Sequence, residues 1–404
     1  ADLDRAIELD PTNGNALAQR GEFYRLEDRY EEALADFNRA IESEPTYAWA
    51  LASRGQTHHA LEHYQEALAD FDRAIELEPD LAWALLSRGR TYQALNRHEE
   101  ALTDLDRAIE LDPTAGLPRV TRGLLFRILK RYEEALADFD RAIELDPTLT
   151  WIRASRAQTH YALEHYQAAL ADFDRALELD PTDAWTLASR GRTYYALMRY
   201  EEALADLDRA HELDPTDEIT LVSRGRIHKS LGRYEEALAD FDRAIELDPA
   251  DAYVLAQRGE TYRLDRRYEE ALADFDRAVE IDPTDGWTIY QAAVTLRLLN
   301  SPDEQSYWRK AADALAVEAD ALHSAGDPDQ LDALGTLVAA RCALREWDGA
   351  GEDLERFLAG GPDSVSIRDA LHRLTEIQQP SAAPAELQAL RRLLEEALAA
   401  AGGA

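Results

Sequence analysis

Apolar residues recur along this chain with the spacing of an α-helix, in two stripes that alternate. In residues 14–47, Leu17, Gly21 and Tyr24 fall within about 60° of one another on a helix of 3.6 residues per turn. A second apolar stripe follows at Ala33, Phe37, Ala40 and Ile41. Polar and charged residues fill the positions between. The two stripes predict a pair of amphipathic helices that pack against each other.

The same pair of stripes returns every 34 residues. Prolines mark the step at Pro11, Pro45, Pro79, Pro113, Pro147, Pro181, Pro215, Pro249 and Pro283. With the proline placed at column 32 of a 34-column repeat, eight complete repeats follow: 14–47, 48–81, 82–115, 116–149, 150–183, 184–217, 218–251 and 252–285. Because proline ends one helix and the Thr or Asp after it can cap the next, each repeat is predicted to be a helix–turn–helix hairpin.

The pattern continues in altered form at both ends of the chain. Residues 1–13 align with columns 22–34, so they predict a half repeat with only a second helix, and we expect the chain to be a fragment of a longer parent. Residues 286–362 predict degenerate hairpins with a long helix after Pro302. Residues 363–404 predict two closing helices, 364–378 and 384–400, joined by a linker and followed by a frayed tail at Gly402 and Gly403.

The columns resemble those of the tetratricopeptide repeat (TPR), which places Gly at column 8, Tyr at 11, Ala at 20, Phe at 24, Ala at 27 and Pro at 32. The match spans roughly two thirds of the chain, with local departures such as Ala157 at column 8. The resemblance implies an all-α fold, a right-handed α-solenoid or superhelix of hairpins. It also implies that the first helices line a concave groove and that the second helices cover much of the convex side.

Composition excludes several partners. Lys and Arg number 44 against 80 Asp and Glu, a net charge of −36 that repels nucleic acid and anionic lipid. No apolar run is long enough for a membrane helix. Cys342 is the single cysteine, so an intrachain disulfide or a multi-cysteine metal site is excluded, and a cytoplasmic location is expected.

The charge is divided unevenly between the two helices of a repeat. Columns 1–16 of the eight repeats sum to +17, whereas the second helices are acidic. If the first helices line a groove, that groove is basic and aromatic inside an acidic shell. Columns 2, 5, 9 and 12 lie opposite the packing stripe of the first helix and are predicted to face it.

Aromatic and basic side chains at three of these columns are the candidate ligand-binding residues, because such groups dominate binding energy at interfaces and arginine holds carboxylates bidentately. Column 2 contributes Trp49, Trp83, Trp151 and Trp185. Column 9 contributes Arg90, Arg192 and Arg226. Column 12 contributes Arg127, Tyr161, Tyr195, Lys229 and Arg263.

Structural roles compete with ligand binding at several columns. The tryptophans of column 2 could pack across the junction between repeats instead of contacting a ligand. Arginine stands at column 7 and Asp at column 23 in all eight repeats, which favours a structural ion pair or carbonyl contact, so column 7 is left out of the site. The acidic pairs at columns 18 and 19 are typical of a solvated helix start, although a basic partner for them stays open.

No residue pattern indicates an enzyme, a cofactor or a metal site. His58, His160 and His228 stand at column 11, where other repeats have Tyr or Phe, and are interpreted as core substitutes. His59 and His63 have i,i+4 spacing but lack a specified acidic or Cys partner. Phosphate-binding loops, nucleophile elbows and zinc-protease motifs are missing, and an active site would be singular where these carboxylates repeat.

The leading hypothesis is a protein–protein interaction scaffold that binds a peptide or protein segment with acidic and apolar groups in the groove. Column 5 is apolar, as at Ala18 and Ala52, so the carboxylate clamp of chaperone-binding TPR proteins is not expected. A second hypothesis is the C-terminal sensor of a larger signalling ATPase, from the resemblance to TPR arrays that follow nucleotide-binding domains in bacterial regulators. A third is self-assembly through the apolar edge at Leu3, Ala6 and Ile7.

Overall fold

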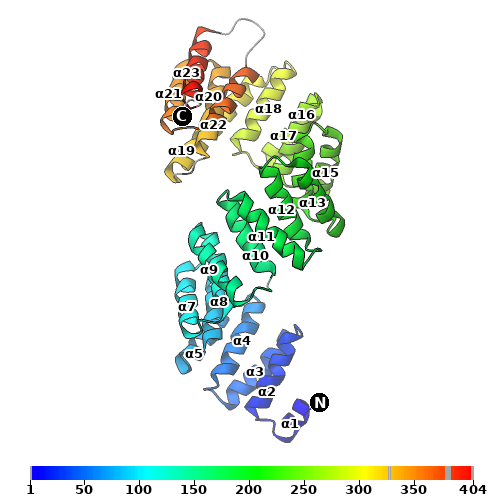
Figure 1. Cartoon of the computed structure of the whole chain (residues 1–404), viewed down its shortest axis with the longest axis vertical. Coiled ribbons are helices and arrows are strands. Elements are labelled where there is room, and N and C mark those ends of the chain that lie inside the picture. The colour runs from blue at the N-terminus through cyan, green and yellow to red at the C-terminus, as the bar shows by residue number, and fades with distance from the viewer. Residues whose placement is uncertain (1, 149, 326, 328, 378–383, 402–404) are drawn as a thin grey trace. The chain divides into compact units, whose positions relative to one another are not determined.

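The computed structural model describes residues 2–148, 150–325, 327, 329–377 and 384–401, and these residues form helices and turns without a strand. The chain divides into two compact units, Ala1–Arg199 and Tyr200–Ala404, here called the N-terminal and C-terminal units. They run from blue to green and from green to red in Figure 1. Most of the predicted linker, residues 379–383, and the predicted tail at Gly402 and Gly403 lie outside the described residues.

The N-terminal unit is a stack of helical hairpins. Its helices are α1 (Asp2–Leu9), α2 (Gly14–Leu26), α3 (Tyr30–Ser43), α4 (Ala48–Ala60), α5 (Tyr64–Leu77), α6 (Ala82–Ala94), α7 (His98–Leu111), α8 (Gly116–Ile128), α9 (Tyr132–Leu145), α10 (Thr150–Ala162), α11 (Tyr166–Leu179) and α12 (Ala184–Ala196). Each second helix packs on its own first helix and on the next one, and successive first helices also touch. This arrangement confirms the predicted all-α solenoid of hairpins.

The C-terminal unit continues the same architecture and then departs from it. Its helices are α13 (Tyr200–Leu213), α14 (Glu218–Ser230), α15 (Tyr234–Leu247), α16 (Ala252–Leu264), α17 (Tyr268–Ile281), α18 (Gly286–Leu298), α19 (Glu304–Ala325), α20 (Gln330–Leu344), α21 (Trp347–Ala359), α22 (Ser364–Glu376) and α23 (Ala385–Ala401). One large apolar core joins α18 to α23 around the fully buried Trp308 and Tyr290. The division of the chain into repeats and end segments stays a prediction.

Most hairpin cores are built on a phenylalanine of the second helix that fills the space left by a glycine of the first, whereas Leu105 takes the place of the phenylalanine in the α6–α7 hairpin and Ala157 that of the glycine in the α10–α11 hairpin. Phe37, Phe139 and Phe275 are fully buried. A Cβ atom added to Gly21 would lie 3.1 Å from the Phe37 ring, closer than ordinary contact. Small residues at column 8 therefore let the two helices approach, as the sequence indicates.

Aspartates at the repeat boundary cap the first helices α12, α14, α16 and α18, and Asn13 caps α2. The side chains of Asp183, Asp217, Asp251 and Asp285 accept a hydrogen bond from a backbone N–H in the first turn of α12, α14, α16 and α18. This confirms the predicted capping by aspartate, whereas Leu149, which precedes α10, lies outside the described residues. Thr12 donates its backbone N–H and its hydroxyl to Asp10, at 3.0 and 2.7 Å, and so closes the turn around Pro11.

The arginines of column 7 are structural, as predicted. In the α10–α11 hairpin, Arg156 donates through Nε and Nη2 to the carboxylate of Asp172, at 2.7 and 2.5 Å. Its third nitrogen, Nη1, donates to Asp140 of the preceding hairpin at 2.5 Å. Equivalent two-hairpin contacts are made by Arg20, Arg54, Arg88, Arg122, Arg224 and Arg258. These arginines connect consecutive repeats and are not available to a ligand.

Candidate functional site

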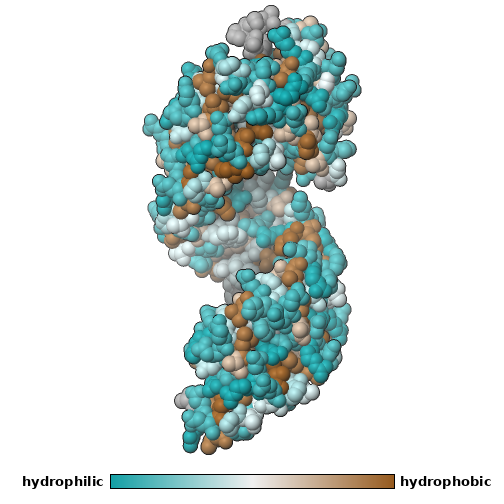
Figure 2. Space-filling view, turned by 180° about the vertical axis from the view of Figure 1, so that it is seen from behind, coloured by the Kyte–Doolittle hydropathy of each residue, from teal (hydrophilic) through white to brown (hydrophobic). Residues whose placement is uncertain are grey.

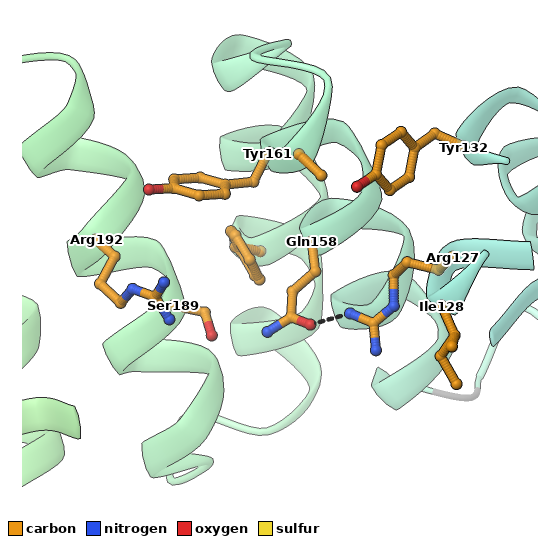
Figure 3. Close-up of a pocket in the computed structure, with 9 residues that line it drawn as sticks. Arg127, Ile128, Tyr132, Gln158, Tyr161, Ser189 and Arg192 are labelled. Atoms are coloured by element: carbon orange, nitrogen blue, oxygen red, sulfur yellow. Dashed lines mark hydrogen bonds between the residues drawn. The ribbon is translucent and has the colours of Figure 1, made fainter. Parts of the chain in front are cut away.

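A pocket of about 440 Å³ lies between the first helices α8, α10 and α12 of the N-terminal unit. It is here called the Arg127 pocket, and it contains three of the predicted site residues, Arg127, Tyr161 and Arg192. The remaining lining residues are Ile128, Tyr132, Gln158, Ala162, Phe173 and Ser189. Figure 3 shows Arg127 approaching Gln158 from one side and Arg192 and Ser189 approaching from the other. Columns 9 and 12 thus share one face, the first-helix face.

Arg127 is a partly buried cation whose hydrogen-bond partner is neutral. Its Nη1 donates to Oε1 of Gln158 on the next first helix, and within the described residues it has no carboxylate partner. Burial lowers the pKa of the guanidinium, because the charged form loses water without gaining an acid. The site therefore has positive charge that no acidic side chain among the described residues neutralises.

Arg192 and Tyr161 form the other side of the pocket. The guanidinium carbon of Arg192 lies 5.8 Å from the centre of the Tyr161 ring, within the range of a cation–π contact. The Tyr161 ring also contacts Tyr166 edge to face at 5.6 Å, which holds the ring in place. No ion pair of Arg192 is found in the described part of the chain. The pocket thus offers two cations on either side of an aromatic ring.

The other cations at column 12 show what Arg127 lacks. Each of them pairs with a glutamate of this chain: Arg25 with Glu22 at 2.5 Å, Lys229 with Glu260 at 2.5 Å, Arg263 with Glu376 at 3.3 Å and Arg297 with Glu304 at 2.6 Å. At these four positions, a carboxylate of the chain therefore compensates the charge of the column-12 cation. Lys229 and Arg263 were predicted to bind ligand, but their pairing within the chain leaves them out of the proposed contacts.

The first-helix face also receives part of the chain itself in the C-terminal unit. The carboxylate of Glu376, at the end of α22, accepts from Arg263 of α16 and from the Tyr290 hydroxyl of α18, at 3.3 and 3.2 Å. Arg297 of α18 donates to the backbone carbonyl of Ile377. An acidic helix end thus occupies this face with its side chain and its backbone.

The remaining predicted residues are placed differently. Arg90 is exposed and lines a smaller pocket, and Tyr195 and Arg226 are half-buried. Trp49 and Trp83 are half-buried in junctions between repeats, and Trp49 contacts Phe37 of the preceding repeat edge to face at 6.5 Å. Trp151 and Trp185 remain 42% and 49% exposed.

Column 5 was expected to face the groove, and that expectation is wrong. Ala18, Ala52 and Val120 at this column are almost fully buried. Successive first helices touch each other, and Leu86 and Val120 of column 5 belong to one apolar core that extends over consecutive hairpins. Of the four columns predicted to face the groove, columns 9 and 12, and column 2 in part, reach the surface.

Comparison with protein families matches most of these repeats. Models described as tetratricopeptide repeat match residues 3–35, 48–81, 82–115, 120–149, 154–183, 184–217 and 222–286, well over half of the chain. The chain belongs to the tetratricopeptide repeat family. The TPR resemblance of the sequence is thereby confirmed, and the repeats support the coarse assignment as a protein–protein interaction scaffold of a generally non-catalytic family.

Solved structures include several TPR proteins with the same helical repeats. A tetratricopeptide repeat protein from Parabacteroides merdae is 21% identical, with 61% of this chain and 98% of that chain covered and a TM-score of 0.50, which shows the fold. YrrB, described as a TPR protein with an unusual peptide-binding site, is 27% identical over 46% of this chain and 96% of its own, with a TM-score of 0.39. Among curated proteins, the comparison finds no match.

The sequence also led to expectations about metal-binding groups, histidines and membrane-spanning helices. Within the described ranges, no group of three or more His, Cys, Asp or Glu side chains is arranged to hold a metal ion. His58, His160 and His228 are half-buried, and burial lowers the pKa of each ring. Among the described helices, none combines the length and the apolar character required to cross a bilayer.

Reasoning from the sequence missed the neutral half of the Arg127 pocket. Gln158 at column 9 and Ser189 at column 6 lie between the two cations. Ile128 and Tyr132 also line the pocket. A comparison of columns 6, 9 and 12 across three consecutive repeats would have brought these residues together. Only the packing of three helices shows that they share one cavity.

Proposed function

We propose that this TPR array is a non-enzymatic scaffold that binds a protein segment with acidic and apolar side chains on its first-helix face. In this proposal, a carboxylate of the partner lies between Arg127 and Arg192 in the Arg127 pocket. Arginine suits this role because its planar donors match a carboxylate and because a hydrogen bond to a charged group is stronger than a neutral one.

The observation that carries the proposal is the unpaired state of Arg127. Four other cations at column 12 are paired with glutamates, whereas Arg127 meets neutral Gln158 and has no acidic partner in the described residues. Glu376 supplies the precedent, since it places a carboxylate on this face in the C-terminal unit. A partner with Glu or Asp would complete the same pairing at Arg127.

Apolar surface near the two cations gives the partner a second kind of contact. Ile128 lines the pocket and is 56% exposed. Trp151 and Trp185 are exposed on α10 and α12, the helices that also carry Tyr161 and Arg192. Exposed aromatic groups beside arginine are the residue types that concentrate binding energy at protein interfaces. We therefore expect an acidic residue flanked by apolar ones.

A library of short labelled peptides, with Glu, Gln, Leu, Trp or Ser at each position, tests the proposal by fluorescence anisotropy. We expect Glu to be selected over Gln at one position or more. The variant Arg127→Glu with Arg192→Glu should lose at least about tenfold in affinity for the selected peptides, because each charge-assisted bond contributes about 1.5–3 kcal/mol.

The matched control is Arg141→Glu with Arg175→Glu, which changes the net charge equally at exposed positions of the second helices α9 and α11. Circular dichroism verifies that both variants keep their helical content. Equal selection of Glu and Gln, or equal losses of affinity in the pocket variant and the control, would refute the proposed site.

A further inference from the structure

The smaller pocket on the first-helix face is a second copy of the Arg127 pocket. It is here called the Arg25 pocket, it lies between α2, α4 and α6, and its volume is about 180 Å³. Its lining residues are Arg25, Gln56, His59, Ala60, Phe71, Ser87 and Arg90. Each of them stands 102 residues, or three repeats, before a lining residue of the Arg127 pocket, and only His59 and Tyr161 differ in type.

The correspondence is more specific than the 34-residue period. At column 9, a glutamine is followed one repeat later by an arginine only twice among the repeats. These pairs are Gln56 with Arg90 and, three repeats later, Gln158 with Arg192. Another three repeats along the chain, Glu260 stands where Gln158 would be repeated, and Val294 stands where Arg192 would be repeated. Lys229, which corresponds to Arg127, forms an ion pair with Glu260, so its charge is compensated within the chain. The duplicated pocket is therefore confined to the N-terminal unit.

The two copies also share their internal arrangement. Arg192 lies over the Tyr161 ring in one. In the other, Arg90 and the His59 ring of the same column line the pocket together, and burial and then the positive charge of Arg90 lower the pKa of His59. The neutral residues between the cations are linked in the Arg25 pocket, where Gln56 Nε2 donates to Ser87 Oγ at 2.8 Å.

One substitution accounts for the difference in charge between the copies. Glu22 pairs with Arg25 at 2.5 Å, whereas the corresponding residue near Arg127 is Leu124. The Arg25 pocket consequently has one cation without an acidic partner in the described chain, Arg90, and the Arg127 pocket has two. Because it has less uncompensated positive charge, the Arg25 pocket is expected to bind an anion more weakly than the Arg127 pocket.

We propose that the two pockets are a strong and a weak subsite for one acidic protein segment that carries two carboxylate anchors. This inference rests on the proposed function. The face between them is continuous, because the first helices α2, α4, α6, α8, α10 and α12 touch one another in sequence within one compact unit. A segment held at Arg127 and Arg192 presents its second anchor to Arg90 at high effective concentration.

Labelled peptides with one or two glutamate anchors, joined by Gly-Ser spacers of increasing length, test the inference in the full chain. Two-anchor peptides should bind more tightly than one-anchor peptides by roughly tenfold or more at one preferred spacer length. The variant Arg90→Gln should remove this gain, while one-anchor peptides still bind at the Arg127 pocket. Calorimetry should give one two-anchor peptide per chain.

Two exchanges of the residue that distinguishes the pockets provide a reciprocal test. Leu124→Glu places an acid three residues before Arg127, as Glu22 stands before Arg25, and should weaken one-anchor binding by about tenfold. Glu22→Leu frees Arg25 and should strengthen two-anchor binding. Thermal unfolding of both variants, followed by circular dichroism, checks that the fold is kept.

The outcomes separate the two proposals. If one-anchor peptides bind but affinity depends neither on the second anchor nor on Arg90, the duplicated site is refuted and the Arg127 site stands. If no glutamate peptide binds, both proposals fail. If Arg90→Gln weakens one-anchor and two-anchor peptides equally, Arg90 acts through general charge and the second subsite is refuted.

Discussion

At the scale of the residue, the turn inside each hairpin places one residue in the left-handed region. Column 15 has φ values of 52° to 71° at Asp28, Glu62, Asn96, Lys130, Glu164, Met198, Gly232, Arg266 and Asn300. Glycine adopts this conformation without cost, whereas other residues lose roughly 1 kcal/mol. Only one of these nine positions has glycine, so most of the turns carry local strain.

Replacement of Glu164 by glycine should therefore stabilise the N-terminal unit. The residue has φ 58° and is exposed, so the change removes strain without a loss of packing. We expect Glu164→Gly to exceed Glu164→Ala in stability by about 1 kcal/mol, because both remove the charge and only glycine relieves the backbone. Urea unfolding followed by circular dichroism measures the difference. Equal midpoints for the two variants would show that column 15 is not strained.

At the scale of the element, consecutive hairpins are joined by the arginines of column 7. Arg156 is bound by Asp172 of its own hairpin, which is almost fully buried, and by Asp140 of the preceding one, which is exposed. A buried carboxylate that loses its partner costs far more than an exposed one. The two contacts of this arginine should therefore differ in energy.

Removal of the arginine should destabilise the stack strongly. We expect Arg156→Met to lower the free energy of unfolding by about 3 kcal/mol, since Asp172 stays buried without a partner. Asp140→Asn should cost less than about 1 kcal/mol. Asn38 already accepts from Arg54 at 2.7 Å in the corresponding contact of another repeat. Urea denaturation compares the variants.

A double variant shows whether the loss at Arg156 comes from the buried charge. Adding Asp172→Leu to Arg156→Met should recover most of the stability, because an apolar pair replaces an isolated carboxylate. If the double variant is as unstable as the single one, the contact is needed for its geometry and not for charge compensation.

At the scale of the whole molecule, the net charge of −36 includes a positive sum on the first helices, but part of that positive charge is compensated by acids of the second helices. The arginines of column 7 contribute to the positive sum of the first helices, yet they bind carboxylates of the second helices. The basic character of the first-helix face is thus local and is centred on Arg90, Arg127 and Arg192. The surface seen in Figure 2 is mainly hydrophilic, with separate hydrophobic patches.

The end of the chain also covers part of this face, which no repeat column indicates. Glu376 lies 113 residues from Arg263 and contacts both Arg263 and Tyr290. The variant Glu376→Gln should weaken this contact and increase amide hydrogen exchange in α22 by about tenfold, equivalent to about 1.4 kcal/mol. Mass spectrometry of peptides from residues 364–377 measures the change.

The control for this experiment is Glu386→Gln, at an exposed position of α23. It should leave exchange in α22 unchanged. The same exchange rate in the wild type and in Glu376→Gln would mean that α22 is held by its packing on α20 and α23, without a contribution from the carboxylate.

The amino-acid sequence by itself determined the helices, the hairpins, the family and the structural role of Arg156 and its equivalents. These features depend on contacts that recur with the 34-residue period, such as Phe37 against Gly21. The same residue pattern therefore appears again in most repeats. Burial of column 5 escaped the helical-wheel argument, because a wheel describes one helix and Ala52 is buried by its neighbours.

Only the tertiary structure decided which cations of the first-helix face are paired with an acid of the described residues and which are not. Arg127 and Arg263 occupy the same column, yet one meets neutral Gln158 and the other meets Glu376 from the end of the chain. The physical reason is that the charge state of an arginine's surroundings is set by side chains brought from other helices. That pairing distinguishes two identical residues in a repeated sequence, and it is the basis on which we propose a site at Arg127 and Arg192.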